Sequence, residues 1–371
     1  RSLALSPDDR TLASVADGEA KLWALGSGQC VSTVACGYGL CVTFCLDGTA
    51  LAVGTKEGAL RLYAVATGDV MDEMVDAHSD AIWSVCTRPG DDSGSSRLLT
   101  ASADHNICLW RLEPRAHGAA TLVREQVHDV GDDAMGARYS ADGRIIAVAL
   151  LDASVKVLFA DTLRLSLTLF GHSLPVLAVA LSSDGTLVAT GSADKTLKVW
   201  GLDFGDCHRS LRAHAEPVMA LEWVRDTHYV FTASKDKTIK YWDCDSFDLI
   251  HVLRAHHAEV WSIALSRAGS FLVSASRDRS LRVWRRSDEQ VFREEEREAE
   301  LEGSLDASLL KQQQTAEAEE DEALALNLDA ITDKSPSEML TELTKAAVGG
   351  KDISSDDSIE VAVTLELKTT I

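Results

Sequence analysis

Residues 170–200 read FGHSLPVLAVALSSDGTLVATGSADKTLKVW and contain the pattern that decides the fold. Apolar and small residues alternate over 176–181, and a Ser-Asp-Gly turn at 183–185 separates this run from a second one at 187–191. A tight turn at Asp194 leads to a run that ends at Trp200, and a fourth run lies near 208–211. Alternation between Gly-, Asp- and Ser-containing turns is typical of short antiparallel strands. The stretch therefore predicts a four-stranded antiparallel sheet.

The run that ends in an aromatic residue recurs along the chain. Its seven anchors are spaced by 40, 47, 48, 42, 42 and 42 residues, and the fourth copy is degenerate, with Leu in place of the aromatic residue. Copies of about 40–45 residues match the period of WD repeats, each of which forms one blade of a β-propeller. We number the copies as repeats one to seven, with anchors at Trp23, Tyr63, Trp110, Leu158, Trp200, Trp242 and Trp284.

The predicted fold is all-β: a seven-bladed WD-repeat β-propeller over residues 1–293, followed by an acidic, partly helical or disordered C-terminal tail. The first blade is expected to be incomplete, because the His-containing segment of repeat one would precede Arg1. Propellers close when a segment from one terminus completes the blade at the other, and residues 289–292 are a candidate for the last outer strand.

Four repeats share a His, a hydroxyl residue, an Asp and a Trp at matching offsets. The Asp precedes the Trp by six residues in all four, and the His precedes the Asp by 22 in the three regular copies. A buried Asp is costly unless its oxygens are satisfied, and a linked network satisfies every member. The predicted structural tetrads are His78, Thr100, Asp104 and Trp110; His172, Thr190, Asp194 and Trp200; His214, Thr232, Asp236 and Trp242; and His256, Ser274, Asp278 and Trp284.

The same residue types also occur in Ser/Thr-His-Asp catalytic triads, but four equivalent triads on successive blades make no sense as one active site. Repeat two departs from the tetrad pattern with Glu57 and Tyr63. Repeat four has Val148 and Leu158 where the hydroxyl and the Trp should be, although it keeps Asp152.

The net charge of the 371-residue chain is −22, and it is unevenly spread. Residues 1–293 carry 30 basic and 37 acidic residues, whereas residues 294–371 carry 6 and 21. This balance argues against broad, non-specific nucleic-acid binding but leaves room for a local basic face. The longest apolar runs fall far short of the ~18 residues that a membrane-spanning helix needs. The sequence begins with Arg1 and shows no signal-peptide pattern, so we expect a part of a longer protein.

Cysteine usage and the absence of catalytic motifs exclude several functions. The sequence has no CxxC pair, phosphate-binding loop, Gly-x-Gly-x-x-Gly, His-Glu-x-x-His or Gly-x-Ser-x-Gly motif. We expect no enzymatic activity, no cofactor, no metal site and no small-molecule substrate. The cysteines are expected to be free core residues of a protein from a reducing compartment, at positions 30, 36, 41, 45, 86, 108, 207 and 244.

Basic residues flank the turn Asp of three consecutive repeats. Equivalent turns lie on one face of a propeller, so these charges are expected to form a patch that meets RNA phosphate or an acidic protein segment. Basic residues at these turns are also common in WD repeats and can simply be solvated. The residues of this basic patch are Lys195, Lys235, Lys237, Arg277 and Arg279.

The last 78 residues differ in composition from the repeats. Residues 294–334 are predicted to be an acidic linker or an isolated helix, because they are rich in Glu, Ala, Gln and Asp. Residues 335–371 are predicted to hold a short helix and a tail: SPSE at 335–338 reads as a capping box, and Gly349-Gly350 ends the helix. This helix either packs on the propeller or docks on a partner, and the strand-like alternation over 359–367 has no assigned place.

Some stretches are more specific than the general repeat. Residues 150–157 read LLDASVKV, residues 189–195 read ATGSADK, and residues 199–208 read VWGLDFGDCH. Together with the Glu-rich exit after Trp284, they resemble the second propeller of the WD repeat-containing protein 3 family, a nucleolar UTP-B family. The resemblance is strongest over about 145–300 and weaker over 38–144. The family's earlier propeller and later helical domain are not recognisable in this sequence.

The resemblance implies a non-enzymatic scaffold of ribosome biogenesis. The family belongs to the UTP-B part of the small-subunit processome, which binds U3 small nucleolar RNA and pre-ribosomal RNA and supports 18S rRNA maturation. The implied partners are other UTP-B WD-repeat proteins and these RNAs, contacted directly or through the complex. The implied location is the nucleus and nucleolus, with no membrane contact. The alternatives are a WD-repeat adaptor elsewhere, such as a ubiquitin-ligase substrate receptor or a signalling scaffold, and a direct RNA-binding protein.

Overall fold

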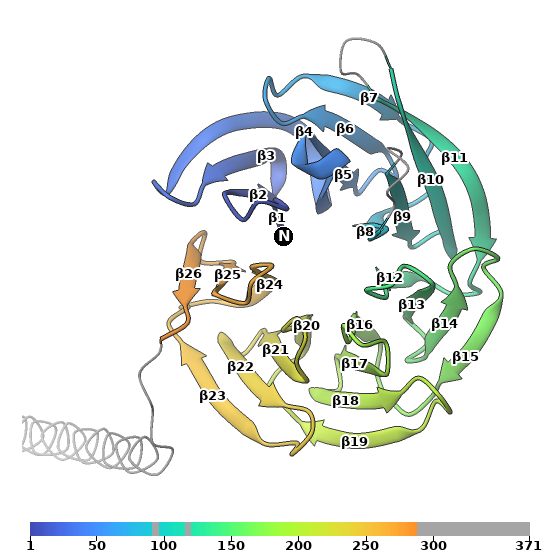
Figure 1. The fold of residues 1–371 in the computed structure, drawn as a ribbon, viewed down its shortest axis with the longest axis vertical. Helices are drawn as coiled ribbons and strands as arrows, with labels where there is room; N and C mark the ends of the chain where they lie inside the picture. Colours follow the sequence, from blue (N-terminus) through green and yellow to red (C-terminus); the bar gives the residue numbers. More distant parts are fainter. Residues whose placement is uncertain (91–95, 116–119, 288–371) are drawn as a thin grey trace, which may run out of the picture. The chain divides into compact units, whose positions relative to one another are not determined.

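The computed structural model describes residues 1–90, 96–115 and 120–287. These residues form short antiparallel strands arranged as sheets around a central axis, with one 3₁₀ turn at Leu46–Gly48 (Figure 1). The innermost strand of each sheet faces the axis, and the chain begins there at Arg1. The described residues thus have the architecture of an all-β propeller.

Four blades have four strands each, paired in chain order. Repeat five follows the expected plan, with strands separated by the turns at 183–185 and at Asp194. The strands of the four blades are, in chain order, β8 (Ile82–Thr87), β9 (Arg97–Ser102), β10 (Asn106–Pro114) and β11 (Ala120–Asp129); β12 (Ala134–Tyr139), β13 (Ile145–Leu150), β14 (Val155–Phe159) and β15 (Leu165–Leu169); β16 (Val176–Leu181), β17 (Leu187–Ser192), β18 (Thr196–Gly201) and β19 (Cys207–Arg212); and β20 (Val218–Trp223), β21 (Tyr229–Ser234), β22 (Thr238–Asp243) and β23 (Leu249–Arg254).

A fifth blade has three described strands, β24 (Val260–Leu265), β25 (Phe271–Ser276) and β26 (Leu281–Arg285). The candidate outer strand at 289–292 lies outside the described residues. So do the predicted acidic linker at 294–334, and the helix and tail at 335–371.

The prediction of seven separate blades is wrong, because the structure has five and a wider sheet in place of the others. The first strands form one continuous seven-stranded sheet in chain order. They are β1 (Ser2–Leu5), β2 (Thr11–Val15), β3 (Asp17–Ala24), β4 (Gln29–Cys45), β5 (Ala50–Thr55), β6 (Leu60–Ala64) and β7 (Val70–Met74). The 17-residue β4 joins the two halves, because its first part pairs with β3 and its second part pairs with β5.

The middle of β4 differs in sequence from the connection between two regular blades. In a regular blade a His-containing loop separates the outer strand from the next inner strand, as residues 213–217 separate β19 from β20. The corresponding residues 35–39 of β4 read ACGYG and contain no His. The backbone of these residues continues its ladder with β3, and Tyr38 is paired with Asp17.

Apolar side chains fill the spaces between neighbouring sheets. One cluster joins Val199 of β18 to Val218 and Trp223 of β20, and the Trp223 indole N–H donates to the Ala180 carbonyl at 2.9 Å. Another joins Leu3 and Leu12 of the first sheet to Val273 of the last blade. The first and last sheets of the described chain are therefore packed against each other, because burial of apolar area stabilises their contact.

All eight cysteines are free, and six of them are buried. Burial raises the pKa of Cys86 to about 11 and that of Cys45 to about 12, so both thiols stay protonated at neutral pH. Cys30 and Cys207 are exposed. The buried thiols behave as small apolar core residues.

Candidate functional site

The structure brings the members of each predicted tetrad together. In repeat six, His214 Nδ1 lies 2.8 Å from Asp236 Oδ2, and His214 Nε2 lies 2.8 Å from Thr232 Oγ1. The Trp242 indole N–H donates to the same hydroxyl oxygen at 3.0 Å. The sets that begin with His78, His172 and His256 repeat these contacts. We call each hydrogen-bonded set a clasp.

A neutral imidazole protonated on Nδ1 satisfies every group of a clasp. The Trp N–H donates to the hydroxyl oxygen, the hydroxyl donates to His Nε2, and His Nδ1–H donates to the carboxylate. The Asp also accepts backbone N–H groups, as Asp236 does from Ala215 at 3.2 Å and from Thr238 at 3.0 Å. The carboxylate thus links the loop before the inner strand to the turn between the second and third strands.

The surroundings of the clasps set the pKa values of their acids and of two imidazoles. Burial lowers the pKa of His78 and His172, because it disfavours the charged imidazolium more than the neighbouring Asp favours it. Burial opposes ionisation of Asp194, but hydrogen bonds from Thr196 and His172 outweigh it and lower the pKa of this carboxyl to about 2. A neutral His beside an ionised Asp is therefore the state of this clasp at neutral pH.

A serine that the sequence analysis did not single out belongs to each clasp. It stands two residues before the Asp, where Ser234 donates to the Glu216 carbonyl at 3.0 Å and accepts from the Asp236 N–H at 3.1 Å. The constant two-residue offset between this serine and the Asp could have identified the serine from the sequence. The series is Ser102, Ser192, Ser234 and Ser276.

The other repeats replace the clasp with simpler contacts. In repeat one, the Trp23 indole donates to Ser14 Oγ at 2.8 Å, a partner hidden from the sequence pattern because it lies nine rather than ten residues before the Trp. In repeat two, the Tyr63 hydroxyl donates to the Ala35 carbonyl at 3.1 Å. In repeat four, Asp152 accepts the Ser154 N–H at 2.8 Å.

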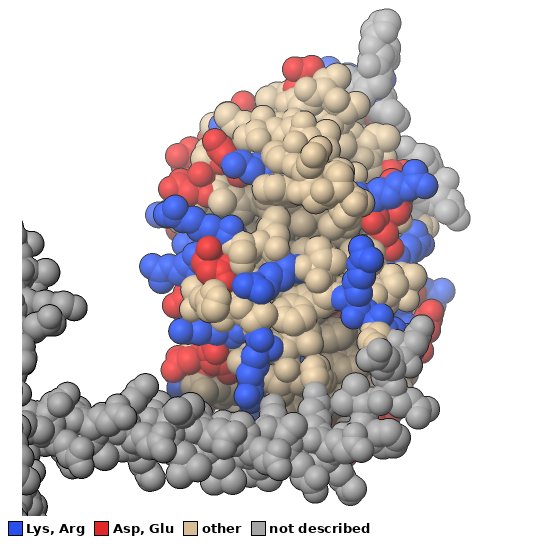
Figure 2. All heavy atoms as spheres, turned by 90° about the vertical axis from the view of Figure 1, so that its left-hand side faces the viewer, with Lys and Arg blue, Asp and Glu red and all other residues tan. Residues whose placement is uncertain are grey.

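The basic patch lies on the face that carries the clasps, because its residues flank the clasp turns. Lys195 and Arg277 lie 3.6 Å and 3.7 Å from Glu216 and Glu259, respectively. Lys237 and Arg279 are exposed. Both adopt a left-handed backbone conformation, with φ of 71° and 64°, directly after the turn Asp. Lys and Arg side chains are interspersed with acidic ones on the side of the molecule that Figure 2 presents.

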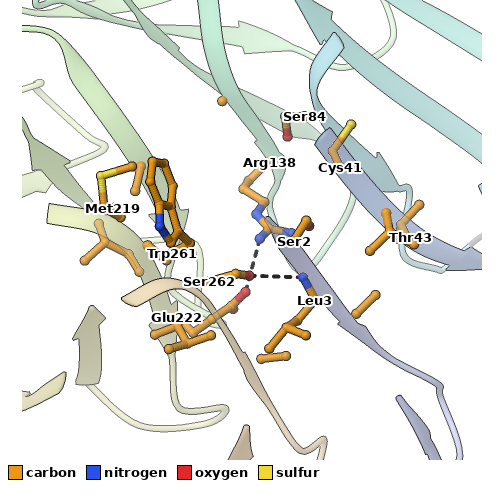
Figure 3. Close-up of a pocket in the computed structure, with 18 of the residues that line it drawn as sticks. Ser2, Leu3, Cys41, Thr43, Ser84, Arg138, Met219, Glu222, Trp261 and Ser262 are labelled. Carbon is orange, nitrogen blue, oxygen red and sulfur yellow. Dashed lines mark hydrogen bonds and ion pairs between the residues drawn. The ribbon is translucent and has the colours of Figure 1, made fainter. Parts of the chain in front are cut away.

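A cavity of about 460 Å³ occupies the axis of the propeller and is lined by residues of the innermost strands (Figure 3). Inside it, Arg138 of β12 and Glu222 of β20 form an ion pair at 3.1 Å. These strands belong to blades that are not adjacent, and Ala180 at the corresponding position of β16 leaves space between them. Burial raises the pKa of Glu222. Ser262 Oγ of β24 accepts the Leu3 N–H at 3.1 Å in the same cavity.

The repeated four-stranded blades and their clasps define the class of protein: a WD-repeat β-propeller. A family model described as the WDR3 second beta-propeller domain matches residues 1–291. The chain belongs to that family. No helix in the described part of the chain is long and apolar enough to cross a membrane.

Curated relatives match about half of the chain. U3 small nucleolar RNA-associated protein 12 of Saccharomyces cerevisiae is 38% identical over 189 residues, which are 48% of this chain and 20% of that protein. WD repeat-containing protein 3 of Homo sapiens is 41% identical over 181 residues, which are 47% of this chain and 19% of that protein. The matched region thus spans about a fifth of each relative.

A solved structure supports the fold alone. A chain in the crystal structure of the mitotic checkpoint complex superimposes with a TM-score of 0.67 at 22% identity. The superposition covers 78% of this chain and 87% of that chain.

Proposed function

We propose that this chain is part of a non-enzymatic scaffold of ribosome biogenesis, a UTP-B component of the small-subunit processome that supports 18S pre-rRNA processing. The observation that carries the proposal is the family match over residues 1–291. The name of the yeast relative, which associates that protein with U3 small nucleolar RNA, points the same way. The expected partners are other UTP-B WD-repeat proteins, with pre-ribosomal and U3 RNA reached directly or through the complex, in the nucleolus.

The clasps support a positional mechanism. Each clasp connects a loop to a turn through side chains that are largely buried. A rigid propeller with fixed loops presents several surfaces to different partners at once. We propose that the tetrads are structural and that the protein holds partners in position without changing them chemically.

The seven-stranded sheet is compatible with seven repeats. The anchors Trp23 and Tyr63 lie on β3 and β6, on opposite sides of β4. The register divides β4 between Ala35, which pairs with β3, and Cys41, which pairs with β5. We propose that the sheet contains repeats one and two, fused through β4.

Affinity purification of the full-length protein that contains this chain tests the proposal. The bait is purified from nuclear extract with and without ribonuclease, and both proteins and RNA are identified. The scaffold function is supported if other large WD-repeat processome subunits are still recovered after ribonuclease treatment while U3 RNA is lost. Recovery of ubiquitin-ligase or signalling components without nucleolar proteins would instead favour an adaptor in another complex.

Two double charge-reversal variants test which surface of this chain contacts RNA or protein partners. Lys237→Glu with Arg279→Glu changes the basic patch, whereas Arg144→Glu with Arg164→Glu changes two exposed residues at turns on the opposite face. Loss of RNA recovery with the first pair alone, without loss of protein partners, would indicate a direct RNA contact at the patch. Equal recovery with both pairs would place the assembly contacts elsewhere on the protein.

A further inference from the structure

One layer of the axial cavity is lined by small side chains. It takes one residue from each of six innermost strands, at the position where the strand resumes its pairing with the neighbouring strand after a register shift. None of these residues is larger than cysteine, so the space around the axis stays open between the strands. We call the set the small-residue layer: Cys41, Ser84, Gly136, Ala178, Ala220 and Ser262.

The charged residues that line the cavity are mainly positive. In the described part of the chain they are three arginines, Arg1, Arg138 and Arg225, and one acid, Glu222. Arg138 and Glu222 lie two residues after Gly136 and Ala220 on the same strands. Because side chains alternate along a strand, each pair of positions shares one side of its strand. The charged residues therefore form the next level of the lining below the small-residue layer.

This charged level lies toward the end of the cavity that faces away from the clasps. The inner strands begin beside the clasp loops, since the Lys235 N–H donates to the Pro217 carbonyl, one residue before β20. Arg138 and Glu222 are the fifth residues of the six-residue strands β12 and β20, and Arg225 follows β20. Arg225 is exposed, so an anion from solvent can reach the level from this end.

The two guanidiniums of this level keep most of their hydrogen-bonding capacity. Arg138 Nη2 donates to Glu222 Oε1 at 3.1 Å, which is the one hydrogen bond of this side chain within the described residues. A guanidinium has five N–H donors in a planar fork, so the others remain available. Figure 3 shows the Arg138 side chain extending across the cavity toward Glu222. Arg225 has no ion-pair partner in the described part of the chain.

Both guanidiniums are close enough to act on the same carboxylate. Arg138 and Arg225 each lower the pKa of Glu222, although burial outweighs them and raises it. Two positive charges thus stand against one negative charge, and the level keeps a net positive charge when Glu222 is ionised. Such a cavity attracts an anion.

The donor groups favour a phosphate as the anion. The planar fork of an arginine matches two phosphate oxygens and binds them through charge-assisted hydrogen bonds. Ser262 Oγ accepts the Leu3 N–H at 3.1 Å, so its own O–H is free to donate into the cavity. The cavity volume of about 460 Å³ falls in the range of about 300–1,000 Å³ that is typical of small-molecule pockets.

We propose that the axial cavity binds a small molecule that carries a phosphate group. The phosphate lies between Arg138 and Arg225, and the rest of the molecule occupies the space inside the small-residue layer, where the Ser262 hydroxyl donates to it. Glu222 holds Arg138 in place and limits the affinity through its own negative charge. The inference goes beyond the proposed function, and the two are tested by separate experiments.

Isothermal titration calorimetry with the complete 371-residue chain tests the proposal. The ligands are pyrophosphate and inorganic phosphate, with citrate as a carboxylate of similar charge. The expected result is saturable binding of one pyrophosphate per chain, with weaker binding of phosphate and the weakest binding of citrate. Binding should weaken when the salt concentration is raised, because the contacts are ionic.

Variants locate the phosphate. Arg138→Gln and Arg225→Gln should each weaken pyrophosphate binding by about tenfold or more, because each removes charge-assisted hydrogen bonds. Glu222→Gln should have the opposite effect and strengthen binding, since it removes the negative charge beside the ligand. This change of sign separates a phosphate site from an ion pair that only holds the strands together.

Two further variants guard against misfolding and non-specific charge effects. Arg138→Gln leaves Glu222 without its ion-pair partner, so Arg138→Gln with Glu222→Gln removes both charges together. This double variant should bind pyrophosphate more weakly than Glu222→Gln alone. The matched control, Arg144→Gln with Arg164→Gln, removes two exposed charges outside the cavity lining and should leave the dissociation constant unchanged.

Several outcomes would overturn the proposal. They are the absence of binding of pyrophosphate and phosphate, equal binding of citrate, affinity that does not respond to Arg138→Gln and Arg225→Gln, and a loss of affinity in Glu222→Gln. An oligouridine with a terminal phosphate tests the other source of the same chemistry. If it binds more tightly than pyrophosphate and with the same sensitivity to both arginine variants, the cavity is a contact for RNA and not for a small molecule.

Discussion

Repeats two and six are copies of one sequence pattern, yet they form different structures. In repeat six, Thr232 joins His214 to Trp242, and the loop before β20 is held by Asp236. In repeat two the residue ten positions before the aromatic anchor is Val53, and the Tyr63 hydroxyl instead binds the backbone at Ala35. The first arrangement ends one sheet and begins the next, whereas the second lets β4 run from one into the other.

The comparison teaches that a clasp stabilises the break between two sheets, although β11 and β12 are separated without one in repeat four. Apolar packing holds both regions together, because Val53 and Tyr63 are as deeply buried as the members of a clasp. Packing does not prevent a strand from continuing along its neighbour, since backbone pairing is favourable wherever two strands run side by side. In repeat six the His214–Asp236 contact holds the connecting segment away from the ladder. In repeat four residues 130–133 separate β11 from β12 without a His.

The largest effect is expected from breaking the clasp of repeat six at its centre. Thr232→Val keeps the side-chain shape but leaves the Trp242 indole N–H and His214 Nε2 without a partner in a buried site. The free energy of unfolding should fall by about 2–4 kcal/mol, because each unpaired buried group costs about 1–3 kcal/mol. Urea titration followed by tryptophan fluorescence measures it. Thr227→Val, which removes two hydrogen bonds of a half-buried hydroxyl at a turn of the same blade, should cost about 1 kcal/mol or less.

A smaller effect is expected from removing the carboxylate of a clasp. Asp194→Ala removes the carboxylate that accepts from the His172 ring N–H and from the Ser173 and Thr196 backbone N–H groups, and should cost about 1–3 kcal/mol. Asp152→Ala in the clasp-free repeat four removes one bond to a backbone N–H and should cost less than about 1 kcal/mol. Equal costs in urea titrations would show that the clasp adds nothing to the turn itself.

Acidification should destabilise the clasped repeats. His78 and His172 have lowered pKa values, so below the ordinary pKa of about 6.5 the unfolded chain binds protons that the folded chain does not. The free energy of unfolding should therefore fall as pH drops from 7.5 to 5.5. It should fall further when the pH approaches the pKa of about 2 of Asp194, whose stabilising contribution is present above about 4.

His228, on the opposite face, has the opposite effect on the pH dependence of stability. Hydrogen bonds to Asp245 and Asp184 raise the pKa of His228, so its contribution is complete below the ordinary His pKa and is lost as pH rises through the raised value. The titration is therefore measured in a His228→Gln background. His172→Gln in that background should reduce the slope between pH 7.5 and 5.5, and an unchanged slope would contradict the assignment.

The smallest effect concerns the backbone of the turn that every repeat shares. The residue after the turn acid has a positive φ in all seven repeats, between 86° at Gly18 and 64° at Arg279; Ala153 has a φ of 69°. An L-residue in this conformation costs roughly 1 kcal/mol relative to Gly. Ala153→Gly should therefore raise the free energy of unfolding by about 1 kcal/mol or less, and a loss of stability in thermal and urea unfolding would contradict this.

The sequence predicted the strands and the tetrad sets well, because both depend on local or fixed spacing. Alternation over residues 176–181 predicted β16, and the six-residue offset from Asp to Trp identified all four clasps. The fusion of repeats one and two was missed, since the absence of a His at residues 35–39 does not reveal where the backbone goes instead. Ser14 was missed because one residue is deleted from the turn of repeat one.

By itself, the sequence determined the all-β repeat architecture and the spacing of the clasp residues, because period-two alternation and constant offsets are properties of the chain. Only the tertiary structure decided which side chains meet around the axis. The lining of the axial cavity combines residues more than 200 positions apart, and the Arg138–Glu222 pair joins strands of non-adjacent blades. Each innermost strand contributes only a few residues to this cavity, so the lining is visible only when the strands are assembled.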